Sequence, residues 1–235
     1  MAIEDNFQII LLTYKRHDLL TARLAELRRF YYNRPDVNLL VVDNGSPDPK
    51  IHMILQSYNE DRGGVWDNRT IRIPENIGFG PAMNHGVEQS AGKYIFLLSD
   101  DVRITGNFVN EIKLDLFAYP DGIICNEVVN WPAGWNQFGL KPVIHYPQGY
   151  FLAFTRDVWE KLGGFDERFV PYDYEDVDLG YRAKLMGIPI VQSSAPVIHD
   201  AAGTIGYSPE RMEHTVRMRA LFAKKWNLPN VPERP

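Results

Sequence analysis

Two uninterrupted apolar runs near the start of the chain restrict its fold more than any other feature. The first run is FQIILLTY (7–14) and the second is NLLVVDN (38–44). Neither run alternates polar with apolar residues, which is typical of strands buried on both faces of a parallel sheet. Between the runs, apolar residues at helical spacing predict an amphipathic helix that contains Leu20, Leu24, Leu27 and Tyr31. Parallel strands need such a crossover, so the segment predicts one βαβ unit.

The same alternation of helices and strands continues along the first half of the chain. The strand pattern recurs in TIRI (70–73) and KYIFLLSD (93–100), and helical patterns lie around 49–59, 81–90 and 107–118. We therefore predict an α/β fold in which helices flank a mostly parallel, doubly wound central sheet.

The second half of the chain has a different character. After residue 120 the predicted strands are shorter, and Pro, Gly and Trp are frequent over 128–149. No linker or repeat separates the halves, so we predict a single domain over 1–235. Its nucleotide-binding half covers about 1–120, and its acceptor-side half covers about 121–235 with a terminal helix near 209–226.

Composition narrows the cellular setting. With 235 residues and 45% hydrophobic content, the chain is long enough to bury the core of one α/β domain. Cys125 is the single cysteine, so no intrachain disulfide can form. No apolar run approaches the roughly 20 residues that span a bilayer, and MAIEDNFQ lacks the order of a signal peptide. These features predict a cytoplasmic protein. The net charge of −5 argues against a broad nucleic-acid surface but leaves a local basic patch open.

Polar residues end each of the predicted parallel strands. The three strand ends are Thr13-Tyr14-Lys15-Arg16, Asp43-Asn44-Gly45-Ser46 and Ser99-Asp100-Asp101. Open α/β sheets bind ligands beyond the carboxyl ends of their strands, so this edge is the predicted site. For Asp43 alone, a role as a loop cap is the alternative, and Ser46 or Asp48 can cap the helix that follows.

Asp100 and Asp101 form the strongest signal at this edge. Two adjacent carboxylates at the end of an apolar strand repel each other unless a cation or hydrogen-bond donors neutralise them. A divalent cation would do so, and oxygen ligands favour Mg²⁺ or Mn²⁺ bridged to nucleotide phosphates. Capping is a poor alternative, because the next predicted helix begins near Asn107, several residues away.

A second group of acids lies in PYDYEDVDLGYRAKLMG (171–187). A helix explains part of it: Asp173 is placed as the N-cap, with Asp176 closing a capping box and Asp178 pairing with Arg182. A cap needs only one or two acids, and the adjacent Glu175 and Asp176 point in different directions. Capping and function therefore both remain open for this segment.

Several motifs, taken in order, resemble the inverting glycosyltransferases of family 2, which have the GT-A fold. The motifs, spread over roughly residues 7–226, are LLTYKR, VVDNGSPD, ENIGFGPAMNHGVEQSAGKYIFLLSDDV, GYFLAFTRDVWEKLGGFDERFVPYDYEDVDLGYRAKLMG and VIHDAAGT. One departure is clear: many rhamnosyltransferase-like members have Asn-Pro-Asp where this chain has Ser99-Asp100-Asp101. The departure bears more on which sugar nucleotide the resemblance implies than on whether a metal binds.

The resemblance implies roles for individual residues. The implied nucleotide pocket contains Thr13, Tyr14, Arg16, Asp43, Asn76 and Asp100, with Asp43 accepting a hydrogen bond from the base. Asp101 is the implied metal ligand beside Asp100, and His199 completes the metal or diphosphate site, although a lone histidine there can also be a loop residue. Asp176 matches the general base, and Glu175 would orient the acceptor.

These roles together predict a metal-dependent, inverting sugar transfer. The expected cofactor is Mn²⁺ or Mg²⁺, and the expected donor carries UDP, then dTDP or GDP in order of preference. The acceptor is a hydroxyl group of a glycan or glycolipid, with nucleic acid or protein left open, as are peripheral membrane contact and a homodimer. A sugar-1-phosphate nucleotidyltransferase is one alternative, but TYKRHD lacks the glycine-rich phosphate loop expected after the first strand. A non-catalytic carbohydrate-binding protein is the other.

Acceptor recognition has the weakest signals. Aromatic residues that could stack on a sugar or belong to the core are Trp131, Trp135, Tyr146 and Tyr150. The basic residues Arg211, Arg217, Arg219, Lys224 and Lys225 could contact an anionic carrier or form a solvated helix face.

Overall fold

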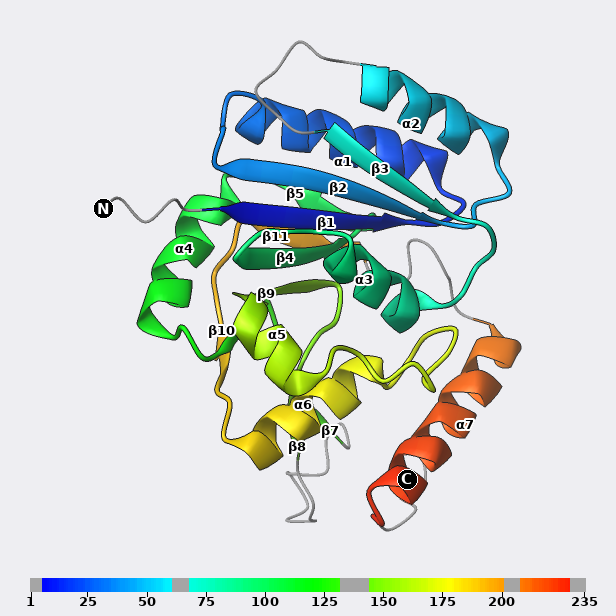
Figure 1. The fold of residues 1–235 in the computed structure, drawn as a ribbon. Helices are drawn as coiled ribbons and strands as arrows, with labels where there is room; N and C mark the ends of the chain where they lie inside the picture. Colours follow the sequence, from blue (N-terminus) through cyan, green and yellow to red (C-terminus); the bar gives the residue numbers. More distant parts are fainter. Residues whose placement is uncertain (1–5, 61–67, 132–143, 201–207, 229–235) are drawn as a thin grey trace.

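The computed structural model describes residues 6–60, 68–131, 144–200 and 208–228 (Figure 1). Its centre is a seven-stranded sheet with strand order β10-β6-β9-β4-β1-β2-β3. These strands are β1 (Phe7–Thr13), β2 (Val37–Asn44), β3 (Asn68–Ile73), β4 (Tyr94–Ser99), β6 (Ile123–Cys125), β9 (Phe151–Thr155) and β10 (Ile190–Gln192). Only β9 runs antiparallel to its neighbours within this sheet. The prediction of a mostly parallel α/β sheet is confirmed, and both halves of the chain contribute strands to it.

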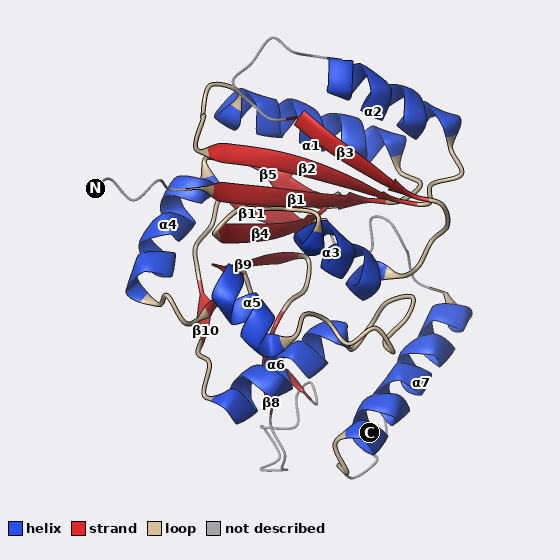
Figure 2. Cartoon of the chain, viewed as in Figure 1, coloured by secondary structure: helices blue, strands red, loops and turns tan. Residues whose placement is uncertain are grey.

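Helices cover both faces of the sheet (Figure 2). They are α1 (His17–Tyr31), α2 (Pro49–Glu60), α3 (Phe79–Glu88), α4 (Phe108–Ala118), α5 (Arg156–Leu162), α6 (Glu175–Met186) and α7 (Pro209–Lys225). Side chains of β1 alternate between the two faces: Ile9 and Leu11 pack with α1, α2 and α4, whereas Ile10 and Leu12 pack with α3, α5 and α6. This two-sided burial explains why the first strands lack polar alternation.

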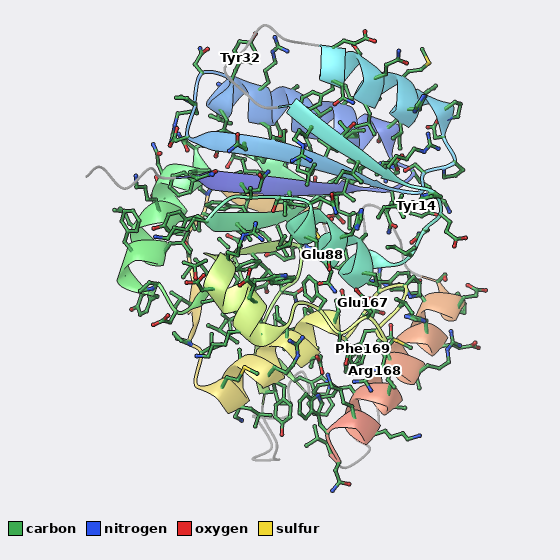
Figure 3. All side chains as sticks on the ribbon, viewed as in Figure 1. Tyr14, Tyr32, Glu88, Glu167, Arg168 and Phe169 are labelled. Atoms are coloured by element: carbon green, nitrogen blue, oxygen red, sulfur yellow. The ribbon has the colours of Figure 1, made fainter. Side chains whose placement is uncertain are left out.

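Two short ribbons and the terminal helix complete the fold. One ribbon pairs β7 (Val128–Trp131) with β8 (Ile144–Pro147), and the other pairs β5 (Val102–Ile104) with β11 (Val197–His199). Phe222 of α7 is buried in a third apolar cluster with Trp131, Ile144, Phe169 and Val177. Figure 3 shows Phe169 beside α7. The terminal helix is thereby packed against the second half of the chain.

The acidic segment departs from its predicted capping role. Helix α6 begins at Glu175, and its N-cap residue, Tyr174, makes no side-chain cap hydrogen bond. The carboxylate of Asp173 is instead hydrogen-bonded to Thr215 of α7, and Asp176 accepts hydrogen bonds from the backbone N–H groups of Gly149 and Val177. The capping predictions for Asp173 and Asp176 are therefore wrong, because both carboxylates are used by tertiary contacts or point toward a cavity.

The prediction for Asp178 is confirmed. Its Oδ2 atom lies 2.8 Å from Arg182 Nε, one helical turn away. Its Oδ1 atom accepts from Lys225 Nζ and Trp226 Nε1, at 2.5 and 2.8 Å. The fully buried Asp178 thus joins α6 to the end of α7.

Candidate active site

The carboxyl ends of β1, β2 and β4 meet at one edge of the sheet. Strand register places Thr13 opposite Asp43, and Leu12 opposite Ser99. Thr13 Oγ1 donates a hydrogen bond of 2.7 Å to Asp100 Oδ2 across the edge. The polar strand ends are therefore neighbours, as the sequence predicts for parallel strands.

A cavity of about 400 Å³ opens at this edge of the sheet. Its lining includes Leu12, Thr13, Tyr14, Lys15, Asn44, Asn76, Phe79, Ser99, Asp100, Asp101, Pro171 and Tyr172. Figure 3 shows Tyr14 where β1 ends. Five of the residues that the resemblance implies for nucleotide or metal binding share this lining, namely Thr13, Tyr14, Asn76, Asp100 and Asp101.

Two predicted nucleotide-binding residues do not line this cavity in the described part of the chain. Arg16 pairs with Asp18 at 2.7 Å and is not among the lining residues. Asp43 is 0% exposed, and its Oδ1 atom accepts a 2.9 Å hydrogen bond from Ser46 N, as in the loop-cap alternative. Asp43 Oδ2 has no hydrogen-bond partner among the described residues and lies 3.6 Å from Arg72 Nε. This buried acceptor therefore pairs with Arg72 but makes no hydrogen bond within the described residues.

Asp101 and His199 form a pair that the β5–β11 ribbon assembles. Antiparallel pairing sets His199 opposite Val102, so the imidazole Nε2 atom lies 3.6 Å from Asp101 Oδ2. The ring of Tyr150 stacks on the imidazole with a centroid separation of 4.0 Å and an interplanar angle of 15°. The stacking restricts the orientation of the imidazole next to the carboxylate.

The charge of Asp101 suits a cation. Burial raises the pKa of its carboxyl, but hydrogen bonds from His199 and Ser99 outweigh burial, and the pKa lies below its ordinary value. The carboxylate is therefore ionised at neutral pH. Among the described residues, no three His, Cys, Asp or Glu side chains cluster as a metal site. One carboxylate and one imidazole fit Mn²⁺ or Mg²⁺ when diphosphate oxygens and water supply the other ligands.

A second cavity, of about 160 Å³, adjoins the first. The two share Phe79, Ser99, Asp101 and Tyr172 in their linings. The remaining lining residues of the smaller cavity are Gln148, Gly149, Tyr150, Asp173, Glu175, Asp176, His199 and Arg211. The acids that end β4 and those that begin α6 therefore face one continuous space.

Burial raises the pKa of both acids at the start of α6. Burial, followed by the adjacent Asp176 charge, raises the pKa of Glu175 well above its ordinary value, and Glu175 Oε2 has no partner among the described residues. Burial therefore favours the protonated form of Glu175. Burial also raises the pKa of Asp176, to about 6, although hydrogen bonds from Gly149 and Val177 oppose the rise. Asp176 is ionised above that pH and is suited to accept a proton.

The aromatic residues proposed for the acceptor side divide into three groups. Tyr150 lines the smaller cavity. Trp131 is only 5% exposed and packs on Phe222 with ring centroids 5.1 Å apart, and Tyr146 packs against the same cluster. These two residues belong to the core, which corrects the acceptor-side prediction for Trp131. Trp135 lies outside the described residues.

Sequence reasoning missed several lining residues. Phe79, Tyr172 and Gly149 lie within the motifs that carry the resemblance but were assigned no role, and Arg211 was grouped with a basic helix face. Gly149 matters because its backbone N–H donates to Asp176 at 3.2 Å. A backbone donor has no signature in residue type, so this contact could not be predicted from the sequence.

Comparison with known proteins identifies relatives of this chain. A rhamnosyltransferase of Mycobacterium tuberculosis, named N-acetylglucosaminyl-diphospho-decaprenol L-rhamnosyltransferase, is 26% identical over 254 residues, covering 87% of this chain and 79% of that protein. The Pyrobaculum calidifontis mannosyltransferase PcManGT, solved with GDP-Man and Mn²⁺, superposes with a TM-score of 0.66 at 18% identity. That match covers 98% of this chain and 66% of the solved chain.

A second solved structure, GalNAc-T7 with UDP, GalNAc and Mn²⁺, gives a TM-score of 0.68 at 11% identity and covers 100% of this chain but 53% of that one. This chain thus spans roughly half to two thirds of these two solved structures. The likeness shows that the fold is GT-A. The model of the family "Glycosyl transferase family 2" matches residues 8–177, which is most of the chain. The chain therefore belongs to glycosyl transferase family 2 and is a glycosyltransferase domain.

Proposed function

We propose that this chain moves a sugar from a nucleoside diphosphate sugar to a hydroxyl acceptor, with inversion at the anomeric carbon and with a divalent metal. One observation carries the proposal: two adjoining cavities share Asp101, and Asp176 lines only the smaller one. The reaction needs a departing diphosphate on one side of the sugar and a base for the acceptor on the other. The two cavities offer separate carboxylates for these two tasks.

On the donor side, the nucleotide would occupy the larger cavity. Asp101 and His199 would hold Mn²⁺ or Mg²⁺, which when bound neutralises charge on the leaving diphosphate. Asp100 accepts from Thr13 Oγ1 and so would fix the end of β1 against the donor. The Mn²⁺ complexes of PcManGT and GalNAc-T7 support the metal.

On the acceptor side, Asp176 would take the proton from the attacking hydroxyl. Glu175 beside it would orient the acceptor or the loop. A single displacement of this kind needs no covalent intermediate, and attack opposite the diphosphate inverts the anomeric centre.

For the substrates, we propose UDP as the nucleotide, then dTDP and GDP, and a glycolipid acceptor. The name of the mycobacterial relative supports a sugar linked through diphosphate to a polyprenol carrier. None of the helices in the described segments is long and apolar enough to cross a bilayer. The single buried Cys125 supports a reducing, cytoplasmic setting.

The Oδ2 atom of Asp43, which makes no hydrogen bond within the described residues, provides a test of nucleotide binding. A carboxylate can accept the imide N–H of uracil or thymine, or the N–H groups of guanine, and the base would displace the half-exposed Arg72 side chain to reach it. Asp43→Ala is therefore expected to weaken nucleoside diphosphate binding by about 1–3 kcal/mol, measured by calorimetry. Asp48→Ala, which removes an acid from the same loop outside both cavities, is the control. Equal affinities for wild type and Asp43→Ala would remove Asp43 from the base site.

The pKa of Asp176 sets the pH dependence of transfer. Since the base must be ionised, the transfer rate should fall as the pH decreases through about 6, the raised pKa of Asp176. The raised pKa also affects stability, because the folded protein binds the Asp176 proton more tightly than the unfolded chain does. The contribution of Asp176 to the free energy of unfolding is complete below the pKa of the unfolded chain, about 4, and is lost as the pH rises through the pKa of the folded protein. A pH–rate profile with saturating donor measures the acidic limb. A rate that stays constant down to about pH 4.5 would exclude Asp176 as the base.

A panel of sugar nucleotides separates the candidate activities. The purified chain is incubated with each sugar nucleotide and Mn²⁺, and the products are identified by chromatography. Sugar transfer, or slow hydrolysis without acceptor, releases a nucleoside diphosphate, whereas a nucleotidyltransferase releases a sugar 1-phosphate and a nucleoside triphosphate when pyrophosphate is added. A carbohydrate-binding protein releases neither. Release of a nucleoside diphosphate from one member of the panel is the expected result.

A further inference from the structure

We propose that the terminal helix α7 positions the catalytic base by holding Asp173, so that Asp173 and Thr215 are positioning residues for glycosyl transfer. The inference rests on the proposed function of Asp176. It concerns the loop at 171–174, which precedes α6 and lines the smaller cavity through Tyr172 and Asp173.

The backbone of this loop needs external support. Asp173 has φ 71° and Tyr174 has φ 74°, so two consecutive residues other than glycine adopt the left-handed conformation. Side chains with a Cβ disfavour this conformation, which persists only where surrounding contacts determine it. Glu175 and Asp176 follow directly, so the direction of the first turn of α6 depends on these two residues.

Three residues in the first two turns of α7 supply that support. Thr215 Oγ1 lies 2.5 Å from Asp173 Oδ2, and Arg211 Nη2 lies 3.5 Å from Asp173 Oδ1. His214 Nε2 lies 2.7 Å from the carbonyl oxygen of Tyr172, and the two rings meet edge to face. Both carboxylate oxygens of Asp173 are therefore directed to α7, and the adjacent peptide is held as well.

The other end of α7 is anchored independently of the loop. Lys225 Nζ lies 2.5 Å from Asp178 Oδ1 and 2.7 Å from Asp166 Oδ2, and Phe222 is buried in the third apolar cluster. Figure 1 shows α7 with its first turn near the loop between α5 and α6. Because the far end is fixed, the first turns of α7 form a rigid support for the loop.

The contacts give Asp173 an indirect role in the reaction. Without the Thr215 contact, the loop can relax toward negative φ and displace the start of α6, which moves Asp176 away from the attacking hydroxyl. Pro171 and Tyr172 of the loop line the larger cavity, but most of its lining, including Thr13, Asp100 and Asp101, lies on other elements. Loss of the support should therefore lower kcat more than it weakens donor binding.

Thr215→Val and Thr215→Ser test this inference. Valine keeps the shape of threonine but removes the hydroxyl, and we expect a fall in kcat of about tenfold with a smaller change in donor Kd. Serine restores the hydroxyl and should restore most of kcat. Thr70→Val is the matched control. Thr70 lies on the edge strand β3 and lines neither cavity of the site, and its Oγ1 atom accepts a 2.7 Å hydrogen bond from Asn59 of α2. Melting temperatures of the two valine variants show whether stability alone explains the fall.

Asp173→Gly provides a second variant, because glycine adopts positive φ without strain yet cannot contact α7. This variant should fold and should also lose kcat. The inference is overturned if Thr215→Val or Asp173→Gly keeps the normal kcat, or if Thr215→Ser is as slow as Thr215→Val. Asp176→Asn, measured in parallel, separates the two proposals. A slow Asp176→Asn with a normal Thr215→Val contradicts only the positioning role, whereas a normal rate for Asp176→Asn contradicts the proposed function as well.

Discussion

Replacement of Asp176 by asparagine is expected to lower the rate of sugar transfer by roughly 10²–10⁴, the range attributed to a positioned general base. Asparagine has the size of aspartate, but its single side-chain oxygen can accept from only one of the Gly149 and Val177 N–H groups, which bond different carboxylate oxygens, and it cannot take a proton. Donor affinity should not change, because the donor cavity is lined by other residues. The measurements are the transfer rate, the donor Kd and the melting temperature.

Asp157→Asn is the matched control for this variant. Asp157 is also an acid in the first turn of a helix, α5, and it lines neither cavity of the site. Its replacement should leave the transfer rate unchanged. An Asp176→Asn protein that melts earlier but transfers sugar at the normal rate would show that the carboxylate serves the architecture of α6 and not the reaction.

Replacement of Asp101 by alanine should also lower the transfer rate strongly, because it alters the binding of the donor's diphosphate. Loss of an electrostatic group at a developing charge typically lowers rates by about 10²–10³, and we expect at least this loss of transfer. Asp101 also pairs with His199, so Mn²⁺ should no longer strengthen the binding of the nucleoside diphosphate. Calorimetry with and without Mn²⁺ measures this effect separately from turnover.

Exposed Asp121 provides the control for Asp101, because Asp121→Ala removes the same charge far from both cavities. The melting temperature of Asp101→Ala shows how much of any loss comes from stability, since Asp101 is buried and accepts a hydrogen bond from Ser99. Full activity of the wild-type chain in excess chelator would contradict the metal assignment.

The central sheet was predictable because its signal is local. Burial on both faces of β1 and β2 removes polar residues from each strand, so continuous apolar runs identify them without tertiary information. The meeting of Thr13, Asp43 and Ser99 at one edge follows from parallel pairing alone. Burial on both faces of the strands predicted the fold class, and parallel pairing predicted that these polar residues lie together at one edge of the sheet.

The pairing of His199 with Asp101 depends on contacts that sequence patterns do not encode. His199 reaches Asp101 only because two three-residue strands, far apart in the chain, pair as an antiparallel ribbon. Resemblance to a family suggested this histidine, whereas its residue type and position alone also allowed a loop role. Short strands carry too few residues for a periodic pattern, so their partners cannot be predicted from one sequence.

Asp173 illustrates a local signal with a tertiary outcome. An acid shortly before a helix is usually a cap, and the spacing to Asp176 matched a capping box. The structure directs Asp173 to Thr215, which lies 42 residues away in the chain. Asp173 contacts α7 instead of capping α6, and this contact follows only from the arrangement of the two helices.

The anomeric configuration of the transferred sugar tests the account most directly. Once the donor and an acceptor are known, the proton coupling constant at the anomeric carbon of the purified product can be measured by NMR. Attack by a hydroxyl that Asp176 deprotonates, opposite a diphosphate held on the Asp101 side, predicts a product with the configuration opposite to that of the donor. A product that retains the donor configuration would contradict a single displacement and the division of tasks between the two cavities.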